Sequence, residues 1–555
     1  MVMRWLPLAL AVLAYVAMSV LVLSHSEKMI EPDPYAYRAS IAALENGDLT
    51  LTQDQYDQLT IDLQSTSLGG GIMQWHQDAD GVWVSEKNPG YPFLAVGFDE
   101  VGALRLAPLF YGALACIGLW LGARRWLGRW GGTFAVGGWC SAAVMMVMAW
   151  RSTMPTYTDA SLVALGLGLM VWTALALDRS HRARVIVGSV AFFSLGLGFL
   201  VRYTNIAVLA VAAVFALFLC VRPRWKLGWK PLVWWALAGG VPVLAALAYN
   251  AAVFSGPFST GYNSTDVKFT TAAISENLKL MPNHLWHAMP VFAIALVAVV
   301  GMIGIQIWAL VRKRKSAHSR LSTSVPTTGD ETAVVEVASV ESEGGIPSLI
   351  ADRWIGLFLL ASWAAVWGIY SAYEWTARMG GGMSGSMPSG FPGGMPGGAM
   401  GPAMGTPNYS IVRFYVPAMG AIVLLAAWLI IRLPRVLGVL VIVGLFIAGG
   451  AGFLSTVNSQ WANQSFGGGG GSPSADGQRG PDGAGDGPSG QRPDFSKCPD
   501  LPVPPSGTGP GGARPGTPPN GGGTGGPPSG GRPGDFQLDD NGCPVLASTT
   551  TVPGA

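Results

Sequence analysis

Residues 31–47 read EPDPYAYRASIAALENG and directly follow the first long apolar run of the chain. Tyr37 and Ile41 recur at helical spacing, which predicts a short amphipathic helix in this stretch. Two carboxylates, Glu31 and Asp33, precede them and would stand at the mouth of a membrane helix bundle. A carboxylate is expensive to desolvate there, so the presence of these two acids needs an explanation. A functional role and simple ion pairing are the two candidates.

The composition argues against a water-exposed globule. The chain is 50% hydrophobic and only 12% charged, whereas soluble domains carry roughly 25% charged residues. The 21 tryptophans fit a protein with many boundaries between water and lipid. A formal net charge of +2 gives no reason to expect a nucleic acid or an acidic partner.

Long apolar segments predict an all-α polytopic membrane protein. A bilayer core needs about 20 apolar residues per helix, and by that criterion the chain holds about eleven candidate transmembrane helices. They lie near residues 5–24, 103–122, 131–150, 159–177, 185–201, 204–222, 232–254, 289–311, 354–372, 414–431 and 436–455. The fifth and sixth are short and close together, so they could be a re-entrant pair or two tilted spans.

Every even-numbered candidate span ends in a basic cluster. The clusters are Arg124, Arg125 and Arg129; Arg179, Arg182 and Arg184; Arg222, Arg224, Lys226 and Lys230; Arg312, Lys313, Arg314 and Lys315; and Arg432 and Arg435. Because Lys and Arg are enriched on the cytoplasmic side, the N-terminus is expected inside the cell and the C-terminus outside. The first apolar run is longer than that of a signal peptide, so we expect an uncleaved anchor in the cell membrane.

The spans divide the chain into two regions. Residues 1–455 form the expected transmembrane domain. Residues 456–555 form an external, Gly/Pro-rich tail that cannot bury enough apolar surface to become ordered. Cys498 and Cys543 in this tail are expected to pair on an oxidising side. The first region is expected to contain external loops at 25–100, 255–288 and 373–412 and a disordered cytoplasmic insert at 316–350.

Two acids near the external ends of spans are candidate catalytic residues. Asp33 could act as a general base and accept a proton from an attacking hydroxyl. The local signals favour a cap for a helix that starts at Pro34, and the two roles are compatible. Asp159 could face the same external cavity, or it could cap the next helix, with Thr158 as the competing cap.

Four cations at external positions are candidate ligands for phosphate. Arg202 and Arg413 run against the positive-inside trend, and a guanidinium binds phosphate bidentately. Snorkelling toward lipid headgroups explains them as well. The same two explanations, binding of phosphate and snorkelling, apply to Arg105 near the outer end of the second span. Lys87 could reach a phosphate as a point charge, although an ordinary solvated lysine is the simpler interpretation of its spacing.

No motif predicts a metal ion or a cofactor. His284 and His287 lack a third ligand, so a role at the membrane boundary is the better interpretation. The sequence has no P-loop and no hydrolase elbow, and its glycine runs have no flanking strand.

The external segments together resemble those of the GT-C superfamily of membrane glycosyltransferases, in particular its aminoarabinose transferases and protein O-mannosyltransferases. The matching residues are Asp33, Tyr37 and the helix at 39–47; DGVWVSEKNPGYP at 80–92; Arg105, Leu106 and Gly112; Asp159; the stretch from Tyr249 to Tyr262; and Arg413 to Pro417. The resemblance covers residues 1–455. Pro34 stands where many members have Glu, and Asn88 stands where they have Pro.

This resemblance implies a glycosyltransferase with a polyprenyl-phosphate-linked sugar donor. The acceptor would be a lipid, a glycan or a protein on the external face, and transfer would invert the anomeric carbon. Asp33 would be the general base, and Asp159 would orient a substrate. The residues expected to bind the substrate or its phosphate are Lys87, Arg105, Arg202, Tyr262 and Arg413. No cofactor and no metal are expected.

A membrane transporter or lipid flippase is the alternative. Such proteins often have internal repeats and broken helices near the bilayer midplane. The two halves of this sequence show no repeat, and the ionisable residues gather at the external ends of spans. A non-catalytic membrane protein that displays its tail is a third possibility, against which the long first loop argues.

Overall fold

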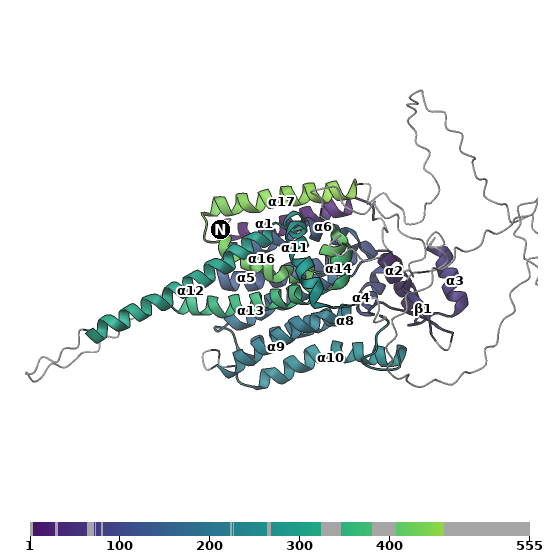
Figure 1. The fold of residues 1–555 in the computed structure, drawn as a ribbon, viewed down its shortest axis with the longest axis horizontal. Helices are drawn as coiled ribbons and strands as arrows, with labels where there is room; N and C mark the ends of the chain where they lie inside the picture. The colour runs from purple at the N-terminus through teal and green to yellow at the C-terminus, as the bar shows by residue number, and fades with distance from the viewer. Residues whose placement is uncertain are drawn as a thin grey trace, which may run out of the picture. The chain divides into compact units, whose positions relative to one another are not determined.

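The computed structural model describes residues 4–27, 32–63, 72, 74–78, 81–222, 225, 227–262, 268–322, 346–379 and 407–459. These residues are mostly helical (Figure 1). The tail beyond residue 459, most of the insert at 316–350 and most of the loop at 373–412 lie outside the described residues, as do Glu31, Cys498 and Cys543.

Nine helices in the described part of the chain are long and apolar enough to cross a membrane, which makes this a multi-pass membrane protein. They are α1 (Leu6–Leu23), α5 (Ala107–Cys140), α7 (Thr156–Leu175), α8 (His181–Val201), α9 (Ile206–Val221), α10 (Lys230–Val253), α12 (Val291–Ser322), α13 (Ile346–Ser371) and α17 (Arg435–Val457). A shorter apolar helix, α16 (Met419–Ile430), follows a 3₁₀ turn η5 (Val416–Ala418). Two further 3₁₀ turns, η3 (Leu104–Leu106) and η4 (Tyr203–Asn205), precede α5 and α9. The prediction of an all-α polytopic protein is confirmed.

Helix α5 consists of two arms that meet at Gly128, whose φ is +79°. Glycine adopts this left-handed conformation without the steric cost that a side chain would bring. The chain turns back at this point, and the two arms then pack closely together. A Cβ added at Gly132 in the second arm would lie 2.7 Å from the Trp120 ring in the first. The second arm leads into α6 (Ala143–Trp150). The turn explains why hydropathy predicts two spans, 103–122 and 131–150, over this region.

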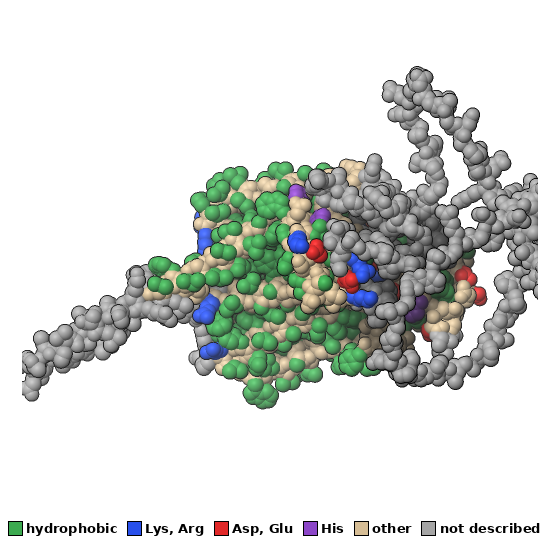
Figure 2. Space-filling model, in the orientation of Figure 1, with side chains coloured by type: hydrophobic (Ala, Val, Ile, Leu, Met, Phe, Trp, Pro, Cys, Tyr) green, Lys and Arg blue, Asp and Glu red, His purple; other side chains and the backbone are tan. Residues whose placement is uncertain are grey.

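Helix α7 is buried along nearly its whole length and packs against α5, α8 and α16. Helix α10 lies along α8, and α9 packs against α13 (Figure 1). Large apolar side chains such as Val214, Leu244 and Val300 are exposed on α9, α10 and α12. Figure 2 shows a flank covered mainly by apolar side chains, with Lys and Arg side chains along one end. A lipid environment accommodates such a flank.

The described residues of the loop expected at 25–100 form a layer of short helices and strands. It contains α2 (Pro32–Glu45), α3 (Gln53–Asp62), β1 (Trp75–Gln77), β2 (Trp83–Ser85) and α4 (Gly90–Asp99). The two strands pair antiparallel, with Trp75 opposite Ser85. Helix α2 packs on α4, and α4 packs on α8. The amphipathic helix predicted from the opening stretch is confirmed as α2, which buries Ala36, Ala39 and Ile41.

Two contacts fix this layer to the end of α8. Gly90, the first residue of α4, touches the α8 backbone so closely that an added Cβ would lie 2.4 Å from the carbonyl carbon of Leu200. The Asn88 side-chain amide donates a hydrogen bond to the main-chain oxygen of Val201 at 3.2 Å. The segment that carries Lys87 is therefore held beside the residue that follows α8, which is Arg202.

The other two loops that were expected to be external also contain helices. Residues 255–288 include α11 (Thr271–Ala288), which is capped by the Thr270 hydroxyl. The described ends of the 373–412 loop form α14 (Glu374–Met379) and α15 (Tyr409–Val412), and α11 packs on both. On the other side of the bundle, α12 continues to Ser322, so the first residues of the insert predicted at 316–350 are helical.

Candidate active site

The carboxylate of Asp33 binds two cations that come from distant parts of the chain. Lys87 Nζ lies 2.8 Å from one carboxylate oxygen, and Arg413 Nη1 lies 2.8 Å from the other. Asp33 stands in the first turn of α2, Lys87 follows β2, and Arg413 follows α15. The side chains are only 13%, 6% and 8% exposed, respectively. A buried carboxylate is compensated here by two buried cations, which leaves an excess of positive charge.

Burial and charge act in opposite directions on these groups. Burial tends to raise the pKa of Asp33, but the charges of Lys87 and Arg413 outweigh it and hold that pKa well below its usual range. Burial also opposes the charge on Lys87, yet the Asp33 carboxylate raises the pKa of Lys87 above its usual value. Both groups are therefore ionised at neutral pH.

Aromatic rings flank both cations. The Lys87 ammonium lies 5.8 Å from the Tyr37 ring centre and 5.6 Å from that of Tyr262. The Arg413 guanidinium carbon lies 5.7 Å from the Trp375 ring centre and 5.0 Å from that of Phe414. These distances are in the range of cation–π attraction, which helps to hold a desolvated charge.

A second ion pair joins Asp159 to Arg202. The Arg202 Nε lies 3.4 Å from Asp159 Oδ2, and the Asn205 amide donates to the other oxygen. Asp159 is fully buried in α7, and Arg202 occupies the junction between α8 and η4. The Arg202 guanidinium carbon lies 5.6 Å from the Phe414 ring centre, so Phe414 contacts the cations of both ion pairs.

The close packing of another loop places Tyr262 in this cluster. A Cβ on Gly261 would lie 2.5 Å from the Glu86 Cα, so the chain passes directly against the end of β2. Asn250 receives a hydrogen bond from the Tyr203 hydroxyl at 2.7 Å and donates one to the Pro257 oxygen at 3.3 Å. This chain of contacts connects α10 and η4 to the loop that carries Tyr262.

Most of the residues selected from the sequence thus converge. Asp33, Lys87, Tyr262 and Arg413 form one contact group, and Asp159 with Arg202 forms a second that reaches it through Phe414. Arg105 does not join them; its guanidinium donates to the main-chain oxygen of His25.

Three local interpretations of the sequence do not agree with the structure. Asp33 and Asp159 lie inside the first turns of α2 and α7, so neither is the helix cap. The cap of α7 is Pro155, which also excludes Thr158. Lys87 is buried and paired, so the simpler interpretation of a solvated lysine is wrong.

Two aromatic residues of the site, Trp375 and Phe414, were not selected from the sequence. Phe414 directly follows Arg413 in the chain, and this adjacency is the one feature of the sequence that points to Phe414 as a residue of the site. His284 Nδ1 accepts a hydrogen bond from the main-chain amide of Asn408 at 3.2 Å. No cluster of His, Cys, Asp and Glu that could hold a metal occurs in the part of the chain that the structure describes.

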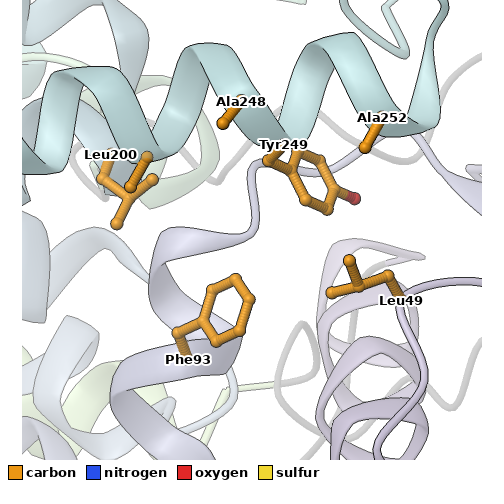
Figure 3. A pocket seen from close by; sticks show the side chains of 7 residues that line it. Leu49, Phe93, Leu200, Ala248, Tyr249 and Ala252 are labelled. Carbon is orange, nitrogen blue, oxygen red and sulfur yellow. The ribbon is translucent and has the colours of Figure 1, made fainter.

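An apolar groove lies beside the cluster. It has a volume of about 420 Å³ and is lined by Leu49, Phe93, Leu200, Ala245, Ala248, Tyr249 and Ala252. Figure 3 shows Ala248, Tyr249 and Ala252 on one helix, α10, facing Phe93 and Leu49. A smaller hollow next to it shares Leu49 and Tyr249 with the groove and is also lined by Lys87. Leu49 and Tyr249 thus separate the apolar groove from a small hollow of about 20 Å³ that has a buried cation in its lining.

Comparison with known proteins gives one structural likeness. No protein-family model matches the chain, and no curated protein does so. The structure resembles that of ArnT from Cupriavidus metallidurans bound to undecaprenyl phosphate, with 16% sequence identity and a TM-score of 0.44. The match covers 81% of this chain and 64% of that chain. This protein therefore spans less than two thirds of the length of the ArnT chain.

Proposed function

We propose that this protein transfers a sugar from a polyprenyl-phosphate-linked donor to an acceptor hydroxyl on the external face of the membrane. The observation that carries the proposal is the buried Asp33 carboxylate held by Lys87 and Arg413, with Lys87 lining a hollow that adjoins an apolar groove. It combines a proton acceptor with anion-binding groups and a surface for hydrocarbon. The resemblance of the external segments to GT-C glycosyltransferases supports the same reaction.

The groove and the cations together fit an amphiphilic anion. An isoprenoid chain would lie against Leu49, Phe93 and Leu200, where burial of apolar surface is favourable. Its phosphate would then meet Lys87, which borders the adjoining hollow. Arg413 and Arg202 would supply guanidinium groups, which match the geometry of phosphate oxygens. The Nη1 of Arg202 is buried and makes no hydrogen bond within the described residues, so it retains a donor for a ligand.

The proposed reaction is a single displacement at the anomeric carbon. The acceptor oxygen forms a bond to that carbon while the bond from the carbon to the phosphate oxygen breaks. The phosphate leaves with the bonding electrons, and the acceptor proton passes to Asp33. Lys87 and the two arginines stabilise the charge that develops on the phosphate, which is often the largest contribution to catalysis. Attack opposite the leaving group inverts the configuration of the carbon.

Asp159 has a different proposed role. It is fully buried and already paired with Arg202, so it positions that guanidinium and does not accept the proton. The hydrogen bond from Asn205 fixes the carboxylate itself. Removal of Asp159 would leave Arg202 buried without its counter-ion, and such a loss is strongly destabilising.

The proposal is tested by supplying membranes with a polyprenyl-phosphate sugar and measuring transfer to endogenous acceptors. Asp33→Asn should abolish transfer because the amide cannot accept the proton. Asp159→Asn should reduce it through misplacement of Arg202. Asp54→Asn, which changes an exposed acid of the same external layer, should leave it unchanged. Transfer at the wild-type rate by Asp33→Asn removes Asp33 as the base. Movement of an unmodified solute without sugar transfer favours the transporter alternative.

A further inference from the structure

The Asp33 carboxylate, as the structure holds it, is poorly suited to accept a proton. Each of its oxygens already contacts a cation at 2.8 Å. A general base works best when its pKa is near the operating pH, and these two cations instead hold the pKa of Asp33 far below that. The proposed base must therefore lose a counter-ion before it can act.

Lys87 is the counter-ion that a donor can remove. It contacts Asp33 and is also one of the residues that line the hollow beside the apolar groove. Its ammonium is a compact charge on a flexible chain, so a small rotation can exchange one anion for another. Arg413 is not among the residues that line the groove or the hollow, so a donor bound there meets Lys87 first.

We infer that the donor phosphate takes Lys87 away from Asp33 and thereby frees the carboxylate for catalysis. This inference rests on the proposed transfer reaction. The pair of cations exceeds the one carboxylate by a positive charge, which a phosphodiester bound to Lys87 neutralises. With Lys87 bound to phosphate, Asp33 keeps only Arg413 and one oxygen becomes available to the acceptor hydroxyl. Acceptor activation therefore follows donor binding, which protects an unloaded site from unproductive proton transfer.

This exchange predicts that the Asp33 carboxylate and the lipid phosphate compete for the Lys87 ammonium. Binding of decaprenyl monophosphate to the full-length protein in phosphatidylcholine nanodiscs should be about tenfold tighter in Asp33→Asn than in the wild type, because the competing charge is gone. Lys87→Met should bind it more weakly. Asp54→Asn is the matched control and should bind like the wild type. Unchanged or weaker binding by Asp33→Asn overturns the exchange and leaves the proposed function intact.

A measurement on the wild type covers the case in which Asp33→Asn does not fold. Infrared difference spectra of protein labelled with ¹³C-aspartate should show a shifted carboxylate stretch when decaprenyl monophosphate is added. Decaprenol, which lacks the phosphate, should give no such shift. Binding of the phosphate without any carboxylate shift overturns the exchange. If no variant and no wild-type protein binds decaprenyl monophosphate, the proposed donor class is wrong as well.

Discussion

The side-chain amide of Asn88 donates a hydrogen bond to the main-chain oxygen of Val201. Asn88 neighbours Lys87 in the chain, and Val201 neighbours Arg202, so this single bond connects the segments of two candidate phosphate ligands. In the GT-C pattern that the sequence resembles, proline stands at this position. Proline has no side-chain amide, so the tether depends on the asparagine found here.

Loss of this tether should affect both stability and donor use. Asn88→Ala leaves a buried carbonyl without its donor, which costs about 1–3 kcal/mol. We expect a lower unfolding temperature and a higher apparent KM for the donor, because Lys87 is no longer held against α8. Asn46→Ala, which removes an exposed hydrogen bond on α2, is the control and should change neither value. An unchanged KM for Asn88→Ala would show that the bond does not position Lys87.

The close contact of α4 with α8 allows a test within a single helix. Gly90→Ala would place a Cβ 2.4 Å from the Leu200 carbonyl carbon, and backbone atoms cannot move aside as a side chain can. Overpacking of this kind costs roughly 1–3 kcal/mol. Gly97→Ala in the same helix meets nothing within 4 Å and should be neutral or slightly stabilising. Thermal unfolding in detergent compares the two. Equal stability of both variants would contradict the described packing.

The ring of Phe414 should matter for catalysis more than for stability. Phe414→Leu retains most of the apolar volume but removes the aromatic face between Arg202 and Arg413. Each cation–π contact is worth about 0.5–2 kcal/mol, so transfer should fall by about tenfold. Phe269→Leu alters a ring that stacks on Tyr373 at 5.2 Å and serves as the control. Transfer by Phe414→Leu at the rate of that control would mean that the shared ring does not place the arginines.

The unfolding free energy should depend on pH through the Asp33 pair. The pKa of Asp33 is lowered in the fold, so its stabilisation is present above the unfolded value of about 3.9 and is lost as pH falls below it. The pKa of Lys87 is raised, so its stabilisation is present below about 10.4 and is lost as pH rises further.

The stability difference between wild type and Asp33→Asn should therefore be largest near neutral pH. It should shrink below about pH 4, because Asp33 of the wild type then takes up a proton on unfolding. Thermal unfolding of both proteins across that range provides the measurement, with Asp54→Asn as the reference for a solvated acid. A difference that stays constant down to about pH 2 would mean that the ion pairs contribute nothing.

The sequence predicts the helices better than it predicts the contacts of the site. Length and hydropathy are enough to place α1, α8 and α17, because a bilayer requires a long apolar run whatever its neighbours are. The helical spacing of Tyr37 and Ile41 is enough to predict α2. These features depend on residues close together in the chain, which a single sequence displays directly.

The ion-pair partners of Asp33 cannot be predicted in this way, because they come from distant parts of the chain. Its local signals, an acid followed by proline, favour a cap, whereas the cations that bind it come from beyond β2 and from the end of α15. Placement at an external span end constrains the depth of a residue in the membrane but not its position around the bundle. For that reason Arg202 and Arg413 lie near one ring, while Arg105, at a similar expected depth, binds His25.

The two counter-ions of Asp33 also leave the ribosome at very different times. Lys87 is synthesised soon after Asp33, but Arg413 follows only after α13, shortly before α16 and α17. A nascent chain that has inserted its early helices thus holds the acid with a single neutralising partner. The second counter-ion of Asp33 is therefore the last charged part of this contact group to be made, and the group is complete only in a chain that has been synthesised past α15.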